Sequence, residues 1–171
     1  ILHDGGYNYK PEDLRFVPCA IDALKQLKEA GYLLIIVTSQ SGIARGYYTE
    51  EDYHNFNEHF LKHAGTFVDA IYYCPHHTEG NPPYNINCNC RKPKTGMIES
   101  AQKKYNCDLK KSWVIGDKTS DVKLGENAGC KTILVQTGKA GTDAAYIITP
   151  TYKAKDLLDA AKHILENDQQ Q

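Results

Sequence analysis

The chain has 171 residues, a formal net charge of −1 at pH 7 and a charged fraction of 24%. This balance offers no basic stripe for nucleic acid. No apolar run is long enough to span a bilayer, and the start lacks the charged-then-apolar layout of a signal peptide. We therefore expect one domain over residues 1–171, working in the cytoplasm without nucleic-acid or membrane partners.

Apolar periodicity predicts helices and strands in alternation along the chain. In chain order, helices are expected near 21–31, 50–63, 97–105, 121–128 and 155–165, and strands at 33–37, 70–73, 113–115, 132–135 and 146–148. Thr49 and Asp52 have the spacing of a capping box at the start of the second helix. This order predicts an α/β fold, with a Rossmann-like parallel sheet, helices on both faces and no large cap domain.

Polar residues follow the strand at 33–37, in the order Thr38, Ser39, Gln40, Ser41 and Gly42. In open parallel sheets, ligands bind beyond the carboxyl ends of the strands. Hydroxyls, an amide and backbone N–H groups at such an end suit phosphate oxygens. The alternative is a simple turn, because Ser and Gly are common in turns.

Four potential metal ligands lie within seventeen positions: Cys74, His76, Cys88 and Cys90. Three thiols and one imidazole match a closed tetrahedral zinc site with a structural role. The alternative is reduced cysteines beside an exposed histidine, and His77 competes with His76 as the fourth ligand. The Pro- and Asn-rich loop favours zinc held by His76, and metal fits a reducing cytosol better than disulfides do.

Charged residues follow this loop and the strand at 113–115. Arg91 and Lys92 come directly after Cys90, where a fork of donors and a point charge suit a phosphoryl group. Asp117 and Asp121 lie four residues apart and can share a hard cation such as Mg²⁺. The alternative for Arg91 and Lys92 is a pair of solvated basic side chains. The alternative for the two aspartates is that one caps a helix and the other is solvated.

These segments together resemble the haloacid dehalogenase superfamily of phosphatases. More narrowly, they resemble the D-glycero-D-manno-heptose 1,7-bisphosphate 7-phosphatases, with histidinol-phosphate phosphatases as near relatives. The matching sequence motifs occur in the same order as in the family. They are residues 6–7, 11–13, 38–46, 72–77, 88–93, 96–97, 116–118 and 135–138. The resemblance implies an Mg²⁺-dependent enzyme that removes the C7 phosphate through an aspartyl-phosphate intermediate.

The resemblance also implies a role for each matched residue. Thr38 would hydrogen-bond the transferring phosphoryl group, Lys92 would neutralise its charge, and Arg91 would recognise the substrate. Asp117 would bind Mg²⁺, with Asp121 orienting nearby. The sugar-phosphate pocket would also be lined by Asp4, Gly5, Gly6, Tyr7, Ser39, Gln40, Ser41, Arg45 and Lys118. The structural zinc would be held by Cys74, His76, Cys88 and Cys90.

Two features depart from the family pattern. Ser39 stands where the family usually has Asn, so one amide donor is lost. The family nucleophile lies in an Asp-x-Asp-Gly-Thr stretch at the end of a central first strand, and Ile1 comes immediately after that stretch. Asp4 has Leu2 two positions before it and is not assigned as the nucleophile. We expect about ten to fifteen residues before Ile1, whose absence would leave unpaired strands around a void.

Other functions stay open at this point. Histidinol-phosphate phosphatase is the alternative within the same class of enzymes, and polynucleotide 3′-phosphatases, which lack the cysteine loop, rank third. The alternative from a different class of function is a non-catalytic domain that is stabilised by zinc and binds a phosphosugar. For each function that involves a phosphosugar, the expected partner is a small phosphorylated sugar and the expected oligomeric state is a monomer.

Overall fold

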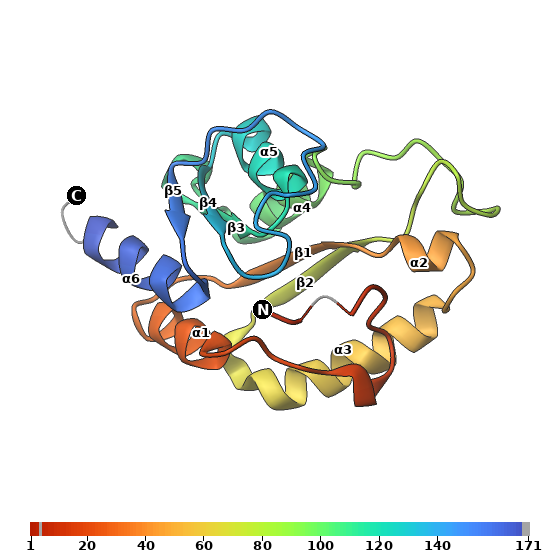
Figure 1. Cartoon of the computed structure of the whole chain (residues 1–171), viewed down its shortest axis with the longest axis horizontal. Helices are drawn as coiled ribbons and strands as arrows, with labels where there is room; N and C mark the ends of the chain where they lie inside the picture. The colour runs from red at the N-terminus through yellow and green to blue at the C-terminus, as the bar shows by residue number, and fades with distance from the viewer. Residues whose placement is uncertain (4, 169–171) are drawn as a thin grey trace.

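Two parallel sheets carry the fold, and helices cover both of their faces (Figure 1). The computed structural model describes residues 1–3 and 5–168. Strand β1 (Ile35–Ser39) pairs with β2 (Ala70–Cys74), and β3 (Trp113–Gly116), β4 (Lys131–Val135) and β5 (Tyr152–Ala154) form the second sheet in that order. Every pairing is parallel.

The helices lie in two layers. They are α1 (Ala20–Glu29), α2 (Ser41–Ala44), α3 (Glu50–Ala64), α4 (Gly96–Tyr105), α5 (Thr119–Ala128) and α6 (Leu157–Asp168). Figure 1 shows α4 and α5 on one side of the sheets, and α1, α3 and α6 on the other. The predicted parallel α/β fold with helices on both faces is confirmed. No described helix has the length and apolar character needed to cross a membrane.

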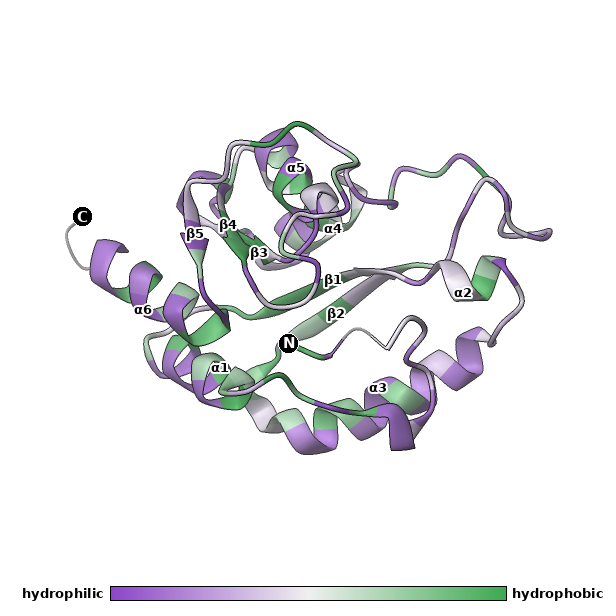
Figure 2. Ribbon diagram, viewed as in Figure 1, coloured by the Kyte–Doolittle hydropathy of each residue, from purple (hydrophilic) through white to green (hydrophobic). Residues whose placement is uncertain are grey.

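Apolar periodicity and capping explain why these helices form where they do. Thr49 Oγ1 accepts the N–H of Asp52 at 3.1 Å, and Asp52 accepts the N–H of Thr49 at 2.8 Å, so the predicted capping box is present. On α1, Leu24 and Leu27 are buried against the core. Figure 2 shows apolar residues concentrated on the strands and on the helix faces that turn toward them.

The predicted strand at 146–148 is wrong. These residues lie in the loop between β4 and β5, where Ile147 is 95% exposed and Tyr146 donates its N–H to Thr119 Oγ1 at 3.3 Å. The fifth strand is Tyr152–Ala154 instead, a short strand beside β4. An apolar triplet is too short to distinguish a strand from a loop by its pattern alone.

The two sheets are separated by a cavity of about 730 Å³. Among the described strands, β1 pairs with β2 alone, and β3 pairs with β4 and with no strand on its other side. Residues 35–38 of β1 and 113–116 of β3 line the cavity. Much of the cavity lining is apolar, and polar residues line the end of the cavity where both strands end. We call this end the mouth.

Candidate active site

The mouth of the cavity gathers predicted site residues from three separate segments. These residues are Thr38 and Gln40 after β1, Lys92 after the cysteine loop, and Asp117, Lys118 and Asp121 after β3. Hydroxyl, amide, ammonium and carboxylate groups therefore meet at the carboxyl ends of parallel strands, where ligands bind in such sheets.

Lys92 links the two sheets at this mouth. Its Nζ lies 2.6 Å from Asp121 Oδ1 and donates to the carbonyl oxygen of Val37 at 3.4 Å. The Lys92 and Asp121 side chains are only 14% and 10% exposed. An ammonium group in this position is nearly dehydrated, so its charge acts strongly on an anion beside it.

Asp121 is held by its own helix as well as by Lys92. The Lys118 N–H donates to Asp121 Oδ2 at 3.1 Å, at the start of α5. A Cβ atom on Gly116 would lie 2.2 Å from the Asp121 Cβ, so the strand end accepts glycine only. With both carboxylate oxygens engaged, Asp121 holds Lys92 in place.

The loop after β4 fixes Asp117 at the end of β3. Asp117 Oδ2 accepts the Lys139 N–H at 2.7 Å, and its carbonyl oxygen accepts the Gly141 N–H at 2.8 Å. Gly138 has φ +71°, and a Cβ there would approach Asp117 Oδ2 to 2.4 Å. Residues 135–138 match the family pattern, but no role was predicted for this loop from the sequence. The signal that could have indicated its role is Gly138.

A hydrogen-bonded chain orders the segment after β1. Tyr48 Oη donates to Gln40 Oε1 at 2.6 Å, and Gln40 Nε2 donates to Thr38 Oγ1 at 2.9 Å. Burial raises the pKa of Tyr48, so its hydroxyl stays a donor. Ser39 pairs with Cys74 in the sheet, and Ser41 begins α2. Neither serine lines the cavity mouth.

Arg45 and Arg91 lie together beside the cysteine loop, away from the lining of the mouth. Arg91 Nη1 donates to the carbonyl oxygen of His76 at 3.2 Å. Arg45 Nη2 lies 3.2 Å from His77 Nε2 and 3.5 Å from Glu79 Oε2, while its Nε is buried without a partner among the described residues. Burial, then the charges of Arg91 and Arg45, lower the pKa of His77.

The four predicted metal ligands converge. Their ligand atoms all lie within 4.8 Å of one another. Cys74 Sγ is 2.9 Å from Cys90 Sγ and 3.5 Å from Cys88 Sγ, and His76 Nδ1 is 3.3 Å from Cys90 Sγ. The separations of 3.5 Å and 3.3 Å are close to the edges of a tetrahedron around one zinc ion, about 3.5–3.8 Å for bonds near 2.0–2.3 Å, and the Cys74–Cys90 separation is shorter than such an edge. The structure brings His76 into the cluster and turns His77 toward Arg45.

Glu50 ties the cysteine loop to the start of α3, a link that sequence reasoning missed. Its carboxylate accepts the Tyr84 hydroxyl at 2.6 Å and also the Tyr73 hydroxyl. The hydrogen bond from Tyr73, followed by that from Tyr84, lowers the pKa of Glu50. Tyr84 lies between the ligands Cys74 and Cys88 in the chain, so Glu50 anchors the loop that carries the cluster.

The predicted residues near the start of the chain are less closely tied to the mouth. Asp4 lies outside the described residues. Gly6 and Tyr7 form a bend, with Gly6 at φ +92°, and Gly5 donates its N–H to the carbonyl oxygen of His3 at 3.1 Å. The Tyr7 ring meets the Tyr47 ring edge-on, with centroids 4.8 Å apart. None of these three described residues lines the cavity.

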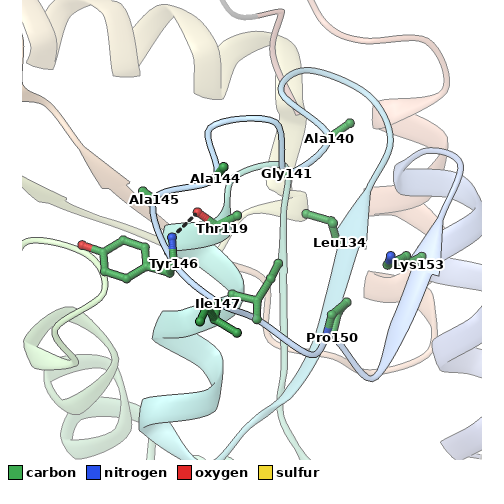
Figure 3. Close-up of a pocket in the computed structure, with 11 residues that line it drawn as sticks. Thr119, Leu134, Ala140, Gly141, Ala144, Ala145, Tyr146, Ile147, Pro150 and Lys153 are labelled. Atoms are coloured by element: carbon green, nitrogen blue, oxygen red, sulfur yellow. Dashed lines mark hydrogen bonds between the residues drawn. The ribbon is translucent and has the colours of Figure 1, made fainter.

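A second pocket, of about 490 Å³, lies between β4, β5 and the loop that joins them (Figure 3). Thr119 faces it, but the Thr119 hydroxyl is bonded to Asp143 Oδ2 at 2.7 Å. Lys153 is the one charged residue in its lining. None of the predicted site residues lies in this pocket, so the chemistry is sought at the cavity mouth.

Known proteins resemble this chain in both sequence and fold. The HAD-hydrolase-like family model matches residues 89–160. The D-glycero-beta-D-manno-heptose-1,7-bisphosphate 7-phosphatase of Pasteurella multocida is 46% identical over 144 residues, covering 82% of this chain and 78% of that protein. The D-glycero-alpha-D-manno-heptose-1,7-bisphosphate 7-phosphatase of Photorhabdus laumondii is 44% identical, covering 77% and 75%.

A solved structure shares the fold. The D,D-heptose 1,7-bisphosphate phosphatase of B. bronchiseptica, complexed with magnesium and phosphate, superposes with a TM-score of 0.82 at 27% identity, covering 93% of this chain and 88% of that one. The chain therefore belongs to the D-glycero-D-manno-heptose-1,7-bisphosphate 7-phosphatases, a family of haloacid dehalogenase-like hydrolases.

Proposed function

We propose that the protein is an Mg²⁺-dependent phosphatase that removes the C7 phosphate of D-glycero-D-manno-heptose 1,7-bisphosphate. The observation that carries this is the meeting of Thr38, Lys92 and Asp117 at one cavity mouth, in a chain 46% identical to a phosphatase named for this substrate. Hydroxyl, ammonium and carboxylate groups are the set that phosphoryl transfer uses for positioning and charge stabilisation.

Thr38 and Lys92 hold the transferring phosphoryl group in this proposal. The Thr38 hydroxyl accepts from Gln40 Nε2, which leaves its own O–H to donate to a phosphate oxygen. The Lys92 ammonium has three donors. Two of them go to Asp121 and Val37, and the third remains for phosphate. Arg91, held by the cysteine loop, together with Arg45, supplies positive charge to the second phosphate of a bisphosphate.

Asp117 is assigned to Mg²⁺. Its carboxylate is a hard oxygen ligand, and the hydrogen bond from Lys139 fixes its orientation while leaving lone pairs on both oxygens. Asp121 belongs to the surroundings of this site, because Lys92 and the Lys118 N–H engage its oxygens. When bound, the ion would neutralise charge on the phosphate.

The nucleophile is assigned to neither of these aspartates. Asp117 and Asp121 are both held in other roles, and the resemblance places the attacking aspartate and its acid–base partner in an Asp-x-Asp-Gly-Thr stretch. In-line attack needs a carboxylate at the cavity mouth, opposite the leaving oxygen. A non-catalytic phosphosugar-binding domain is the second candidate. It is favoured because no described strand joins the two sheets, and because the described carboxylates at the mouth, Asp117 and Asp121, are held in other roles.

Zinc is assigned to Cys74, His76, Cys88 and Cys90 in a structural role. Three sulfurs and one nitrogen would supply all four ligands of a tetrahedral site and would leave no position for substrate. All six cysteines are free thiols, which supports a reducing cytoplasm as the location. Exposed large apolar residues such as Leu33, Leu61 and Ile147 lie on separate segments, which supports a monomer.

A comparison of substrates tests the proposed function. Phosphate release is measured with Mg²⁺ from heptose 1,7-bisphosphate and from histidinol phosphate. We expect kcat/KM for the heptose bisphosphate to exceed that for histidinol phosphate by more than about 100-fold. A higher kcat/KM for histidinol phosphate would identify the protein as a histidinol-phosphate phosphatase. Calorimetric binding of heptose bisphosphate without turnover of either compound would assign the non-catalytic reading.

A further inference from the structure

The last two turns of α3 carry two histidines on one side of the helix. His59 and His63 lie four positions apart, and they are the one pair at this spacing among the seven histidines of the sequence. Residues four apart are neighbours on a helix surface. The buried side chains of α3 are Tyr53, Phe56, Phe60 and Ala64. The two histidines lie beside this buried face, with His63 exposed and His59 half-buried, so both imidazoles are open to solvent.

The rings of His59 and His63 lie close together. Their centroids are 4.5 Å apart and their planes are inclined by 47°. Two nitrogens bound to one metal ion at about 2.1 Å lie roughly 3.0–3.4 Å from each other. The torsion that turns an imidazole ring is soft, so a modest rotation brings one nitrogen of each ring to this separation without a change in the helix backbone.

A hydrogen bond of His63 selects the nitrogen that can bind a metal. His63 Nδ1 lies 2.9 Å from the carbonyl oxygen of His59. A carbonyl oxygen only accepts, so Nδ1 carries the proton and Nε2 keeps its lone pair in the neutral ring. Metal-binding histidines typically donate their other ring N–H to a backbone carbonyl or a carboxylate, which orients the ring. No described residue hydrogen-bonds to the His59 ring, so its nitrogens are available as well.

We propose that His59 and His63 bind a further metal ion, separate from the cysteine cluster and from the site of Asp117. The ion is a late divalent transition metal such as Ni²⁺, Cu²⁺ or Zn²⁺, because imidazole nitrogen suits these ions, whereas Mg²⁺ takes oxygen ligands. The two imidazoles supply two ligands, and water completes the coordination at this exposed position. The bound ion joins successive turns of α3 and so stabilises the C-terminal end of the helix.

His54 provides the matched control on the same helix. It lies five positions before His59, so its ring does not face the pair. Its Nε2 is 3.3 Å from the Tyr73 hydroxyl, and its ring meets the Tyr73 ring edge-on with centroids 5.5 Å apart. Replacing His54 therefore removes an exposed imidazole from α3 and leaves both proposed ligands in place.

Calorimetric titration with Ni²⁺ tests the proposal, on protein supplied beforehand with one equivalent of zinc. Ni²⁺ is the probe because it binds imidazole and is distinguished from zinc by elemental mass spectrometry. We expect one Ni²⁺ per chain, with the zinc content unchanged. The affinity for Ni²⁺ should fall about tenfold or more in His59→Gln and in His63→Gln, because each variant loses one of two ligands. His54→Gln should bind Ni²⁺ as the wild type does.

Three outcomes of the titration would overturn the proposal. The first is equal affinity of the wild type and His59→Gln for Ni²⁺. The second is a loss of affinity in His54→Gln as large as that in His63→Gln. The third is uptake of Ni²⁺ only in exchange for zinc, because the cysteine cluster would then be the site that is measured.

Hydrogen exchange locates the bound ion. Amide protons of residues 60–64 should exchange about tenfold more slowly when Ni²⁺ is bound, while those of α4 should be unchanged. The double variant His59→Gln/His63→Gln should show no effect of Ni²⁺ on exchange. Unchanged exchange at the end of α3 in the wild-type protein would contradict the proposal. No readout here uses phosphate release, so failure of this proposal and failure of the proposed phosphatase activity are seen separately.

Discussion

Lys92 and Asp121 form an ion pair of 2.6 Å that joins the end of the cysteine loop to α5, and both side chains are nearly buried. Through the further contact of Lys92 with the carbonyl oxygen of Val37, this pair connects elements on either side of the cavity. The cation proposed to meet the phosphoryl group is therefore positioned by a carboxylate of the same site.

Lys92→Met should reduce both activity and stability. Loss of one partner leaves Asp121 buried and unpaired, which costs about 3 kcal/mol of unfolding free energy, and kcat should fall by more than about 100-fold. Denaturant unfolding and steady-state kinetics measure the two effects. The double variant Lys92→Met/Asp121→Asn removes the unpaired charge and should recover most of the stability but none of the activity. Recovery of activity would contradict the role of Lys92.

Cys88→Ser should remove the metal and loosen substrate binding. Loss of an outer partner of a metal ligand already lowers affinity 10–100-fold, so loss of a ligand should lower zinc affinity by more than about 100-fold. Arg91 bonds to the His76 carbonyl and should lose its position, so KM should rise more than kcat falls. Zinc content by mass spectrometry and KM measure this. His77→Ala and Cys107→Ser should both retain one zinc per chain; a metal-free His77→Ala protein would reassign the fourth ligand.

Gly138→Ala should weaken Mg²⁺ binding through Asp117. The new Cβ would lie 2.4 Å from Asp117 Oδ2, in addition to the cost of about 1–2 kcal/mol for alanine at positive φ. Gly129→Ala is the matched control, because Gly129 has φ +77° and nothing lies within 4 Å of its added Cβ. Both variants should lose similar backbone energy, but only Gly138→Ala should raise the Mg²⁺ concentration for half-maximal activity, by about tenfold. If Gly138→Ala and Gly129→Ala showed the same Mg²⁺ dependence of activity, the assignment of Asp117 as an Mg²⁺ ligand would be contradicted.

Glu50 should make the stability of the cysteine loop depend on pH. Hydrogen bonds from Tyr73 and Tyr84 lower its folded-state pKa below the ordinary value of 4.5. The unfolded chain therefore takes up the proton first on acidification, and the stabilisation is present above about pH 4.5 and lost as pH falls through the folded-state pKa. The difference in unfolding free energy between wild type and Glu50→Gln should shrink below pH 4.5. Glu51→Gln, at the neighbouring exposed position, is the control for loss of one carboxyl group from the same helix turn.

Local patterns were enough to predict most of the fold. The capping box at Thr49, the apolar face of α1 with Leu24 and Leu27, and the β-branched strand runs each act within a few residues, so their signals are visible in the sequence. The prediction of a strand at 146–148 was wrong because it depended on a local pattern alone. Three apolar residues carry too little periodicity, and tertiary contacts of the loop with Thr119 decided its conformation.

Contacts between distant segments could not be predicted in this way. Three contacts in the site each join residues more than twenty positions apart. They are the ion pair of Lys92 with Asp121, the contact of the Gly138 loop with Asp117, and the hydrogen bond from Tyr84 to Glu50. Residue type and position predicted Asp117, after a strand, and Lys92, after the cysteine loop, as site residues, but their partners follow from the way the sheets pack. The cysteine cluster was visible because its ligands share one loop and the strand before it.

The most direct test of the central claim is ³¹P NMR of heptose 1,7-bisphosphate incubated with the protein and Mg²⁺, beside the Asp117→Asn variant. The account predicts loss of the C7 phosphate signal with the C1 signal retained, and a rate at least about 100-fold lower in the variant or without Mg²⁺. An equal rate in Asp117→Asn, or no release of phosphate by the wild-type protein, would contradict the assignment of a phosphatase site to this cavity mouth.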